Sequence, residues 1–516
     1  MIIKVLMLLL FFTLMVGIGF YCRQTATDVN GFVLGGRSVG PWLTAFAYGT
    51  SYFSAVIFVG YAGQFGWKYG IAATWAGLGN AFLGSLLAWV VLGRRTRIMT
   101  QHLDSATMPD FFEKRFGSPG LKLMASVIIF VFLIPYTASL YNGLSRLFGM
   151  AFSIDYAWCI VLMSVLTAIY VIAGGYMATA INDFIQGVVM LVGISAVIWA
   201  ILESKGGLLA ALDGLARIPG PSVLPGGEPT PGIFTSFLGP EPLNLLFVVV
   251  LTSLGTWGLP QMVQKFYAIR NEGAIKKGMI ISTLFAFVVA GGCYFLGGFG
   301  RLFGDKVDIA KDGFDAIIPA MLSNLGPGLI ALTVILVLSA SMSTLSSLVI
   351  ASSSTLTSDF IKSAFVPNMK QKNEVLIIRL FIVVFIAISA VLAILQHKSS
   401  VTFIAQLMGI SWGALAGSFL APFLYSLYWK GTTKAACWAS FAFGSGLMIY
   451  NMLFRATLPA ILRSPINSGA IAMLAGFIIV PVVSWLSKAP DRRFTDALFA
   501  CYERTRQVTA KTDLGE

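Results

Sequence analysis

Charged residues are scarce in this sequence. Lys, Arg, Asp and Glu make up only 11% of the 516 residues, whereas 57% are hydrophobic. A soluble domain carries roughly a quarter charged residues. The mean hydropathy of +0.83 and the recurring apolar runs of about 20 residues, enough to cross a bilayer, exclude a soluble protein. They indicate a membrane protein built from helices, because lipid offers no partner to an unpaired backbone.

Histidine is also rare, and closely spaced cysteine pairs are absent. The sequence has two histidines and five cysteines, and no two cysteines form a C-x-x-C pair. A zinc site or histidine acid–base chemistry needs more of these side chains close together, and a disulfide framework needs an even set of cysteines. No cluster of His, Asp or Glu lies at one end of the apolar runs. We therefore predict that the protein is not an enzyme.

Thirteen apolar segments are long enough to span a bilayer. They cover residues 3–22, 42–66, 70–93, 121–148, 154–173, 181–202, 241–264, 278–300, 327–357, 376–396, 402–428, 434–453 and 468–487. The first resembles a secretory signal peptide, but its apolar run is long and no A-x-A cleavage site follows it. We predict that it is retained as the first of about 13 transmembrane helices in an all-α integral membrane protein.

The excess of positive charge follows this predicted topology. If the N-terminus lies outside, the inner loops and the C-terminal tail carry 24 of the 35 Lys and Arg residues, as the positive-inside rule requires. The predicted protein is a multi-pass protein of the cell (inner) membrane, with its N-terminus outside and its C-terminus in the cytoplasm. The net charge of +13 is then a topology signal and argues against a nucleic-acid partner.

Two predicted outer loops are long, at residues 203–240 and 301–326. The first contains GGLLAALDGLARI, the pattern of a short amphipathic helix, and the Pro/Gly-rich stretch PGPSVLPGGEPTPG. Such loops act either as lids over a site or as solvated connectors, and the sequence does not separate the two.

One apolar segment is unusually rich in hydroxyl groups. Residues 339–355 read SASMSTLSSLVIASSST, and ten of these seventeen side chains are Ser or Thr. Four positions spaced i, i+3, i+4 and i+7 form one stripe on a helix, which Ser346 borders: Ala340, Ser343, Thr344 and Ser347. Neutral oxygens suit a hard cation such as Na⁺ that must enter and leave, and not Zn²⁺. Hydroxyl residues also allow close helix packing and bond back to their own helix, so the stripe alone leaves both interpretations open.

Two other apolar segments carry helix-breaking residues at mid-membrane. Residues 46–63 read FAYGTSYFSAVIFVGYAG, with small and hydroxyl residues in the middle, and residues 252–261 read TSLGTWGLPQ, with two glycines and Pro260. Proline inside a helix removes a hydrogen bond and bends the helix. Counted from the second segment, these are the first and sixth helices of a ten-helix set, and such paired interruptions indicate an inverted repeat with a site at mid-membrane. For the first segment, a straight helix with small packing residues is the alternative.

Asp183, in ATAINDFIQG, is nearly the only acidic residue close to a membrane segment that lacks a loop context. Intramembrane carboxylates are energetically costly and usually functional. This residue either coordinates an ion or caps the N-terminus of the helix that starts near it.

Four motifs make the sequence resemble the sodium:solute symporter family over nearly the whole chain. They are FVLGGRSVGPW (32–42), IAGGYMATAINDFIQG (172–187), SMSTLSS (341–347) and SSSTLTSDF (352–360). The proline-permease branch is the most similar. The resemblance implies a leucine-transporter-type (LeuT-type) fold, a five-plus-five inverted repeat with one extra helix before it and two after. The single transporter domain would comprise an extra first helix and loop (3–41), the two repeats (42–202 and 241–428), two further helices (429–487) and a cytoplasmic tail (488–516).

The resemblance also implies cation sites. The main sodium site would use backbone carbonyls and hydroxyl groups of Thr50, Phe53, Ala340, Ser343 and Thr344. A possible second sodium, which some members of the family bind, would be held by Asp183, Ser346 and Ser347.

A solute would bind between the first, third and sixth core helices, at positions that correspond to Tyr52, Ser54, Tyr136, Thr256 and Trp257. Where proline permeases have an aspartate in the first core helix, this chain has Tyr52. On the sixth core helix, where proline permeases have a tryptophan and a tyrosine, this chain has Thr252 and Thr256. These departures argue against proline itself. The third core helix also lacks an arginine well inside the membrane that could pair with a sialic-acid carboxylate.

The resemblance therefore implies a sodium-coupled secondary active symporter that imports a small organic solute, amino acid or carboxylate-like, by alternating access. Its partners would be Na⁺, the solute and the lipid bilayer, with no obligate protein partner. The alternatives are a proton-coupled or otherwise non-sodium transporter of the same fold, or a transporter-like sensor. Proton coupling needs titratable groups along the path, and the sequence offers little beyond Asp183.

Overall fold

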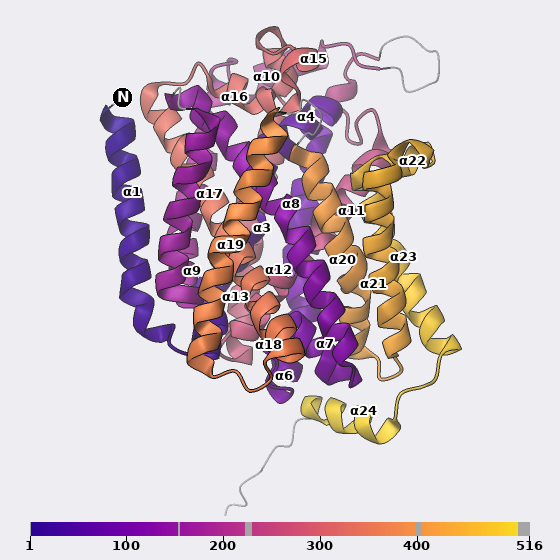
Figure 1. Ribbon diagram of the computed structural model, residues 1–516. Coiled ribbons are helices and arrows are strands. Elements are labelled where there is room, and N and C mark those ends of the chain that lie inside the picture. The colour runs from indigo at the N-terminus through magenta and orange to yellow at the C-terminus, as the bar shows by residue number, and fades with distance from the viewer. Residues whose placement is uncertain (1, 153–154, 222–229, 399–403, 504–516) are drawn as a thin grey trace, which may run out of the picture.

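The computed structural model describes residues 2–152, 155–221, 230–398 and 404–503, which are predominantly helical (Figure 1). Within them, ten helices are long and apolar enough to cross a membrane, or eleven if one sharply bent pair counts as a span. The prediction of a helical multi-pass membrane protein is confirmed. Parts of four predicted segments lie outside the described residues: 154 of the fifth span, 222–229 of the first long loop, 402–403 of the eleventh span and 504–516 of the tail.

Two of these helices are long enough to cross a bilayer twice. They run from Val56 to His102 and from Tyr156 to Glu203, 47 and 48 residues, whereas about 20 residues span the hydrocarbon. The second, α9, kinks at Gly175, whose φ of 56° is left-handed. A Cβ atom there would lie 2.9 Å from the carbonyl oxygen of Phe32. Both the left-handed φ and this close approach therefore require glycine. The kink falls between two of the predicted segments, 154–173 and 181–202.

The first core helix is broken, so of the two interpretations of its sequence the straight helix is wrong. It consists of α3 (Pro41–Tyr52), a π-helical turn η3 (Val56–Tyr61) and α4 (Ala62–Tyr69). Between α3 and η3, Phe53 is extended, with φ −91° and ψ 115°. The last carbonyl groups of α3 therefore have no helical donor above them.

The sixth core helix is broken at a corresponding place. It consists of α11 (Pro242–Gly258) and α12 (Pro260–Ala268), which meet at an angle of 46°. Leu259 between them is extended, with ψ 122°. Pro260 has no N–H to continue the hydrogen bonding and favours an extended residue before it, so the predicted break is confirmed.

The hydroxyl-rich segment forms the buried centre of the molecule. It belongs to α17 (Pro327–Ser354), which η11 (Thr355–Ile361) and α18 (Lys362–Phe365) prolong. Every side chain from Thr333 to Ser354 is buried. The helix packs against α3, α9, α8 (Pro119–Phe152) and α19 (Gln371–Lys398).

The remaining helices surround this centre (Figure 1). The first helix, α1 (Ile2–Tyr21), lies at the edge against α9, while α21 and α23 cover α20 on the opposite side. The last three of these helices are α20 (Ile404–Tyr428), α21 (Lys434–Phe454) and α23 (Pro465–Leu486). The second core helix consists of η4 (Gly70–Ala73), α5 (Thr74–Gly79), η5 (Asn80–Leu87), η6 (Trp89–Gly93) and α6 (Arg94–His102). The seventh consists of α13 (Glu272–Ala286), η8 (Phe287–Gly291) and α14 (Gly292–Gly297).

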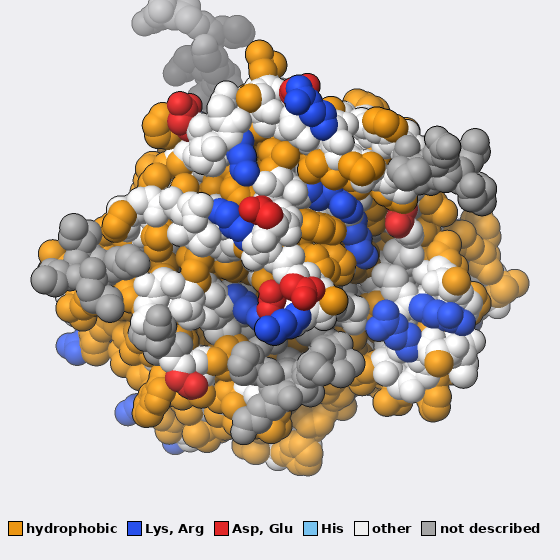
Figure 2. All heavy atoms as spheres, turned by 90° about the horizontal axis from the view of Figure 1, so that it is seen from above, with side chains coloured by type: hydrophobic (Ala, Val, Ile, Leu, Met, Phe, Trp, Pro, Cys, Tyr) orange, Lys and Arg blue, Asp and Glu red, His pale blue; other side chains and the backbone are white. Residues whose placement is uncertain are grey.

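Short helices cover both ends of the bundle. The end carrying the N-terminus is covered by α10 (Leu208–Ala216), α15 (Ile309–Asp312) and α16 (Ile317–Leu322), and α10 matches the predicted amphipathic pattern. Figure 2 shows this end with charged side chains across its face and hydrophobic ones around them. The other end carries α7 (Met108–Phe116) and α24 (Arg492–Phe499).

At that second end, the first motif of the family resemblance ties the two broken helices together. After α2 (Val29–Leu34), the chain turns through Gly35, Gly36 and Arg37, all with positive φ. The Arg37 guanidinium donates to the carbonyl oxygens of Ser105 (2.6 Å) and Tyr267 (3.4 Å). Next to it, the N–H of Arg270 donates to the carbonyl of Val39 at 3.0 Å. The entry to α3 and the exit from α12 are thereby held together.

Candidate sodium and solute site

Two hydroxyl groups of α17 face the break in the first core helix. The Ser343 hydroxyl lies 3.1 Å from the carbonyl oxygen of Thr50. The Thr344 hydroxyl lies 3.1 Å from the same oxygen and 3.3 Å from the carbonyl of Phe53. Both hydroxyls are also 3.1 Å from the carbonyl of Ala340. The structure thus brings together all five residues that the sequence predicts for the main sodium site.

This cage holds three carbonyl and two hydroxyl oxygens and no formal charge. The carbonyls of Thr50 and Phe53 are available because α3 ends at Tyr52 and leaves them without helical donors. All five residues are at most 1% exposed. Hard oxygen ligands without charge suit a weakly held alkali cation. Such a cation would join α3 to α17.

The residues predicted for a second sodium are only partly brought together. The Ser347 hydroxyl lies 2.8 Å from that of Ser51 on α3 and accepts a hydrogen bond from the ammonium of Lys265 at 3.0 Å. The same ammonium is 3.9 Å from a carboxylate oxygen of Asp183. The Ser346 hydroxyl instead donates to the carbonyl of Ser343 on its own helix. Asp183 lies inside α9 and not at a helix start, so the alternative that it caps a helix is wrong.

Buried polar groups without hydrogen-bond partners gather near the break in α3. Within the described residues, the hydroxyls of Tyr52, Tyr136 and Tyr294, both amide atoms of Asn80 and the indole nitrogen of Trp412 make no hydrogen bond of good geometry, although Tyr136 interacts with Trp412 and Ser54, and Tyr294 with Asn80. The rings of Tyr136 and Trp412 are 5.8 Å apart. Tyr294 interacts electrostatically with Tyr52 and faces Asn80. Buried polar groups are normally paired, so this set is suited to a polar solute or to water.

The other predicted solute residues are engaged in local bonds. The Ser54 hydroxyl accepts from the N–H of Val56 and so caps the outer half of the broken helix, and it also lies near the hydroxyl of Tyr136. Thr256 and Trp257 on α11 donate to the carbonyls of η5: the Thr256 hydroxyl to Gly84 at 3.0 Å, and the Trp257 indole to Leu83 at 2.9 Å. Ser54 thus lies with the unpaired hydroxyls, whereas the polar groups of Thr256 and Trp257 are held by the second core helix.

A comparison with family models agrees with this geometry. The model described as "Sodium:solute symporter family" matches residues 32–444, which include both broken helices and all of α17. The chain belongs to the sodium:solute symporter family. It is therefore a membrane transporter and not an enzyme, and its family implies sodium as the coupling ion.

Curated relatives in this family match over almost the full length. The osmoregulated proline transporter OpuE of Bacillus subtilis (strain 168) is 28% identical over 489 residues, 94% of this chain and 96% of its own. A sodium/proline symporter of Staphylococcus aureus (strain JH9) is 29% identical over 502 residues, covering 93% and 91% of the two chains.

Solved structures agree in fold. A Na⁺-coupled sialic acid symporter in a substrate-bound, outward-open state superposes with a TM-score of 0.71 at 17% identity, covering 95% of this chain and 99% of its own. MhsT in complex with L-phenylalanine superposes with a TM-score of 0.53 at 16% identity, covering 86% and 98%. The symporter thus has the leucine-transporter-type fold that its sequence implies.

Sequence reasoning missed four residues of this site. Asn80, Tyr294 and Trp412 lie on spans where nothing in the sequence interrupts the apolar pattern, and a single buried aromatic or amide residue is common in membrane helices. Lys265 was counted among the inner-loop cations, because it lies near the end of its predicted span. Its buried position depends on the break at Leu259, which directs α12 into the bundle.

The loop 301–326 places a buried carboxyl group next to η3, the turn that follows the break in the first core helix. Asp315, which is 4% exposed, accepts a hydrogen bond from the N–H of Ile404 at 3.4 Å. A side chain at Gly60 would lie 3.7 Å from its other oxygen. Burial raises the pKa of Asp315 above its ordinary value, to about 6, although the Ile404 N–H and the charge of Arg146 oppose this shift.

We predict that this carboxyl group makes stability depend on pH. Because its pKa is raised in the folded protein, the stability that it contributes is fully present below about pH 4 and is lost as the pH rises through about 6. Going from pH 7 to pH 5 should stabilise the wild-type protein by about 1 kcal/mol more than the Asp315→Asn variant. Thermal unfolding of both proteins in detergent at the two pH values measures the difference, and parallel shifts would contradict the assignment.

Proposed function

We propose that this symporter imports a small organic solute, an amino acid or a related carboxylate, by sodium-driven alternating access in the cell (inner) membrane. One observation carries the proposal: Ser343 and Thr344 of α17 meet the free carbonyls of Thr50 and Phe53 at the break in α3. Sodium would bind in this cage. The thirteen spans, with the N-terminus outside, agree with two helices of double length and with the charge distribution.

Coupling follows from the position of the cage between two parts of the fold. A cation bound there would fasten α3 to α17 and so favour one arrangement of the first core helix. The same break places Tyr52 and Ser54 next to the cage on the solute side, so sodium binding shapes the solute pocket. Each sodium that moves down a potential of 100 mV contributes about 2.3 kcal/mol. Neutral oxygens release the ion once water enters the open site.

The pocket favours a small uncharged or zwitterionic solute. Its unpaired groups are hydroxyls, an amide and an indole N–H, which give and accept hydrogen bonds without carrying charge. A solute carboxylate would face the amino-terminal end of the outer half-helix that begins after Ser54, where the helix dipole favours negative charge. The named transporters OpuE and the staphylococcal symporter carry proline. Tyr52, Thr252 and Thr256 differ from the proline-permease pattern, so we propose that this pocket is shaped for another solute of the same class.

Uptake by the purified protein in proteoliposomes tests the proposed function. Radiolabelled amino acids including proline, short carboxylates, sugars and vitamins are offered with an inward sodium gradient, with an inward proton gradient, or with neither. We expect one amino acid or carboxylate to accumulate under the sodium gradient alone. Uptake driven by protons without sodium would favour the proton-coupled alternative, and facilitated exchange without accumulation would contradict symport.

Substitutions in the oxygen cage should weaken sodium binding. Thr344→Ala removes a hydroxyl ligand, and the loss of one ligand to a cation, about 1.5–3 kcal/mol, should raise the sodium concentration for half-maximal binding by about ten- to a hundredfold. Sodium-induced changes in tryptophan fluorescence measure this concentration. Ser354→Ala is the matched control, because Ser354 is buried on the same helix and bonds only to its own helix, at Ala351. Equal sodium affinity in both variants would disprove the cage.

A further inference from the structure

Lys265 lies within the position that the sequence predicts for a second cation. Its side chain is 2% exposed, and its ammonium donates to the Ser347 hydroxyl at 3.0 Å. The ammonium is 3.9 Å from a carboxylate oxygen of Asp183 and lies 4.9 Å from the ring centre of Tyr176, over its face. A hydroxyl group, a carboxylate and the face of an aromatic ring are groups that commonly bind a cation in proteins.

The place of a cation beside Asp183 is already taken by Lys265. Its ammonium is the basic group next to this carboxyl group, which also lies near the rings of Tyr170 and Tyr176. In the described part of the chain, neither carboxyl oxygen of Asp183 accepts a hydrogen bond. A sodium ion bound to Asp183 and Ser347 would be placed against the ammonium in a buried site, where like charges repel strongly. A sodium and the ammonium therefore exclude each other.

We propose that the Lys265 ammonium is a tethered cation that replaces a second sodium, so that the protein binds one sodium ion per transport cycle. The inference rests on the proposed function at the main sodium cage. The ammonium joins α12 to α17 and α9, and through the Ser347–Ser51 hydrogen bond of 2.8 Å it reaches α3 as well. A second sodium ion bound at this position would connect the same helices. It never leaves the protein, so it adds no gradient energy to solute uptake.

The number of bound sodium ions tests this inference. Equilibrium binding of radioactive sodium to the purified full-length protein in detergent should saturate at one ion per wild-type chain. Lys265→Met leaves Asp183 and Ser347 free and should saturate at two. Adding Asp183→Asn to that variant should return the number to one. Lys276→Met, which removes an exposed lysine eleven positions further on in α13, should stay at one.

Each outcome separates this inference from the proposed function. Two ions per wild-type chain, or one ion in folded Lys265→Met, would overturn it. No sodium bound to the wild type would instead contradict the proposed function. If Lys265→Met aggregates in sodium-free buffer, the inference predicts that high sodium, or the added Asp183→Asn change, restores a monodisperse protein. Aggregation that neither restores would overturn the assignment.

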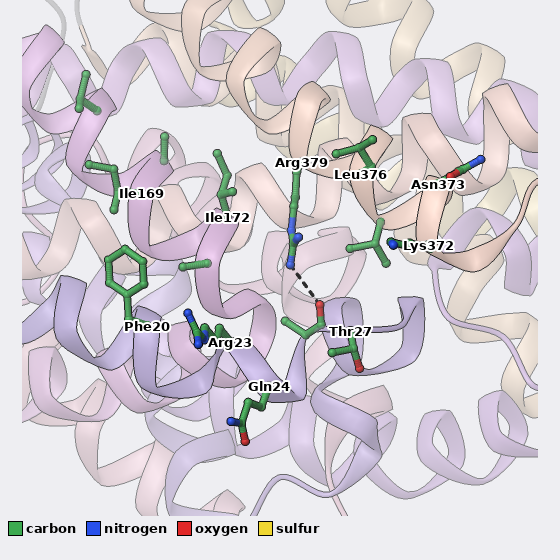
Figure 3. Close-up of a pocket in the computed structure, with 15 residues that line it drawn as sticks. Phe20, Arg23, Gln24, Thr27, Ile169, Ile172, Lys372, Asn373, Leu376 and Arg379 are labelled. Carbon is green, nitrogen blue, oxygen red and sulfur yellow. Dashed lines mark hydrogen bonds between the residues drawn. The ribbon is translucent and has the colours of Figure 1, made fainter.

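An independent feature is a groove at the edge of the molecule, between α1, the first half of α9 and α19 (Figure 3). Its volume is about 1110 Å³. The apolar part of its lining includes Phe20, Val165 and Leu376, which are 53%, 51% and 65% exposed. In a membrane protein, apolar side chains that are so exposed on the outside of the bundle face lipid.

The charged side chains that line this groove are all basic. Arg23, Lys372 and Arg379 line it, and none of its lining residues is acidic. The Arg379 guanidinium donates to the carbonyl of Ala26 at 3.2 Å, while its Nε is buried without an acceptor in the described part of the chain. All three cations lie at the end that the charge distribution assigns to the cytoplasm, where anionic lipids are concentrated.

The geometry points to an anionic phospholipid as the occupant, with its phosphate between Arg23, Lys372 and Arg379 and an acyl chain along the apolar wall. Charge complementarity distinguishes it from a zwitterionic lipid, because three cations face no carboxylate. The site lies at the edge helix and takes no part in the solute pocket. A lipid there would join α1 to α19.

Lipid-dependent stability tests this site. Phosphatidylglycerol should raise the thermal midpoint of the delipidated wild-type protein more than phosphatidylcholine does, and native mass spectra should retain it. Arg23→Gln with Lys372→Gln should abolish the preference, whereas Arg492→Gln with Arg493→Gln, an exposed basic pair on α24, should keep it. Equal stabilisation by both lipids, or an unchanged preference in the first double variant, would overturn the proposal.

Discussion

The structure depends on backbone carbonyl groups that a broken helix leaves unpaired. In lipid, a carbonyl without a donor is costly, and the first core helix can stop at Tyr52 only because α17 supplies hydroxyl groups opposite the break. The oxygen-rich α17 and the interrupted α3 therefore require each other. Neither would be stable next to an apolar neighbour, and several neutral oxygens converge on a small volume where they meet.

This requirement explains why the sequence predicts so much of the site. Breaks and hydroxyl stripes are local patterns, visible as Gly, Ser, Thr and Pro inside apolar runs, and they indicated the two interrupted helices and the hydroxyl side of the cage, Ala340, Ser343 and Thr344. The family resemblance supplied what local pattern could not, namely that segments almost 300 residues apart in sequence lie side by side. The sequence predicted two separate spans around Gly175, whereas the structure joins them in one kinked helix.

The solute pocket was predicted less well, for a physical reason. Its unpaired groups come from five separate helices, and Asn80, Tyr294 and Trp412 each lie alone in an otherwise apolar stretch. Such residues become a site only when helix packing brings them together, which no local pattern encodes. Thr256 and Trp257 show the converse case: they lie at the expected positions, yet their polar groups are already paired with carbonyls of η5.

Lys265 shows how tertiary structure changes the meaning of a residue. In sequence it lies near the end of a span and counts toward the positive-inside signal, but the break at Leu259 turns α12 inward and places the ammonium beside Asp183 and Ser347. A buried carboxylate needs a positive partner, and an ion from solution or a side chain can supply it. An ion is released in each cycle and adds its gradient to the transport energy, whereas a side chain is permanent and holds the inner half-helices without that gain. The choice between the two at a single position therefore sets how strongly a symporter of this fold can concentrate its solute.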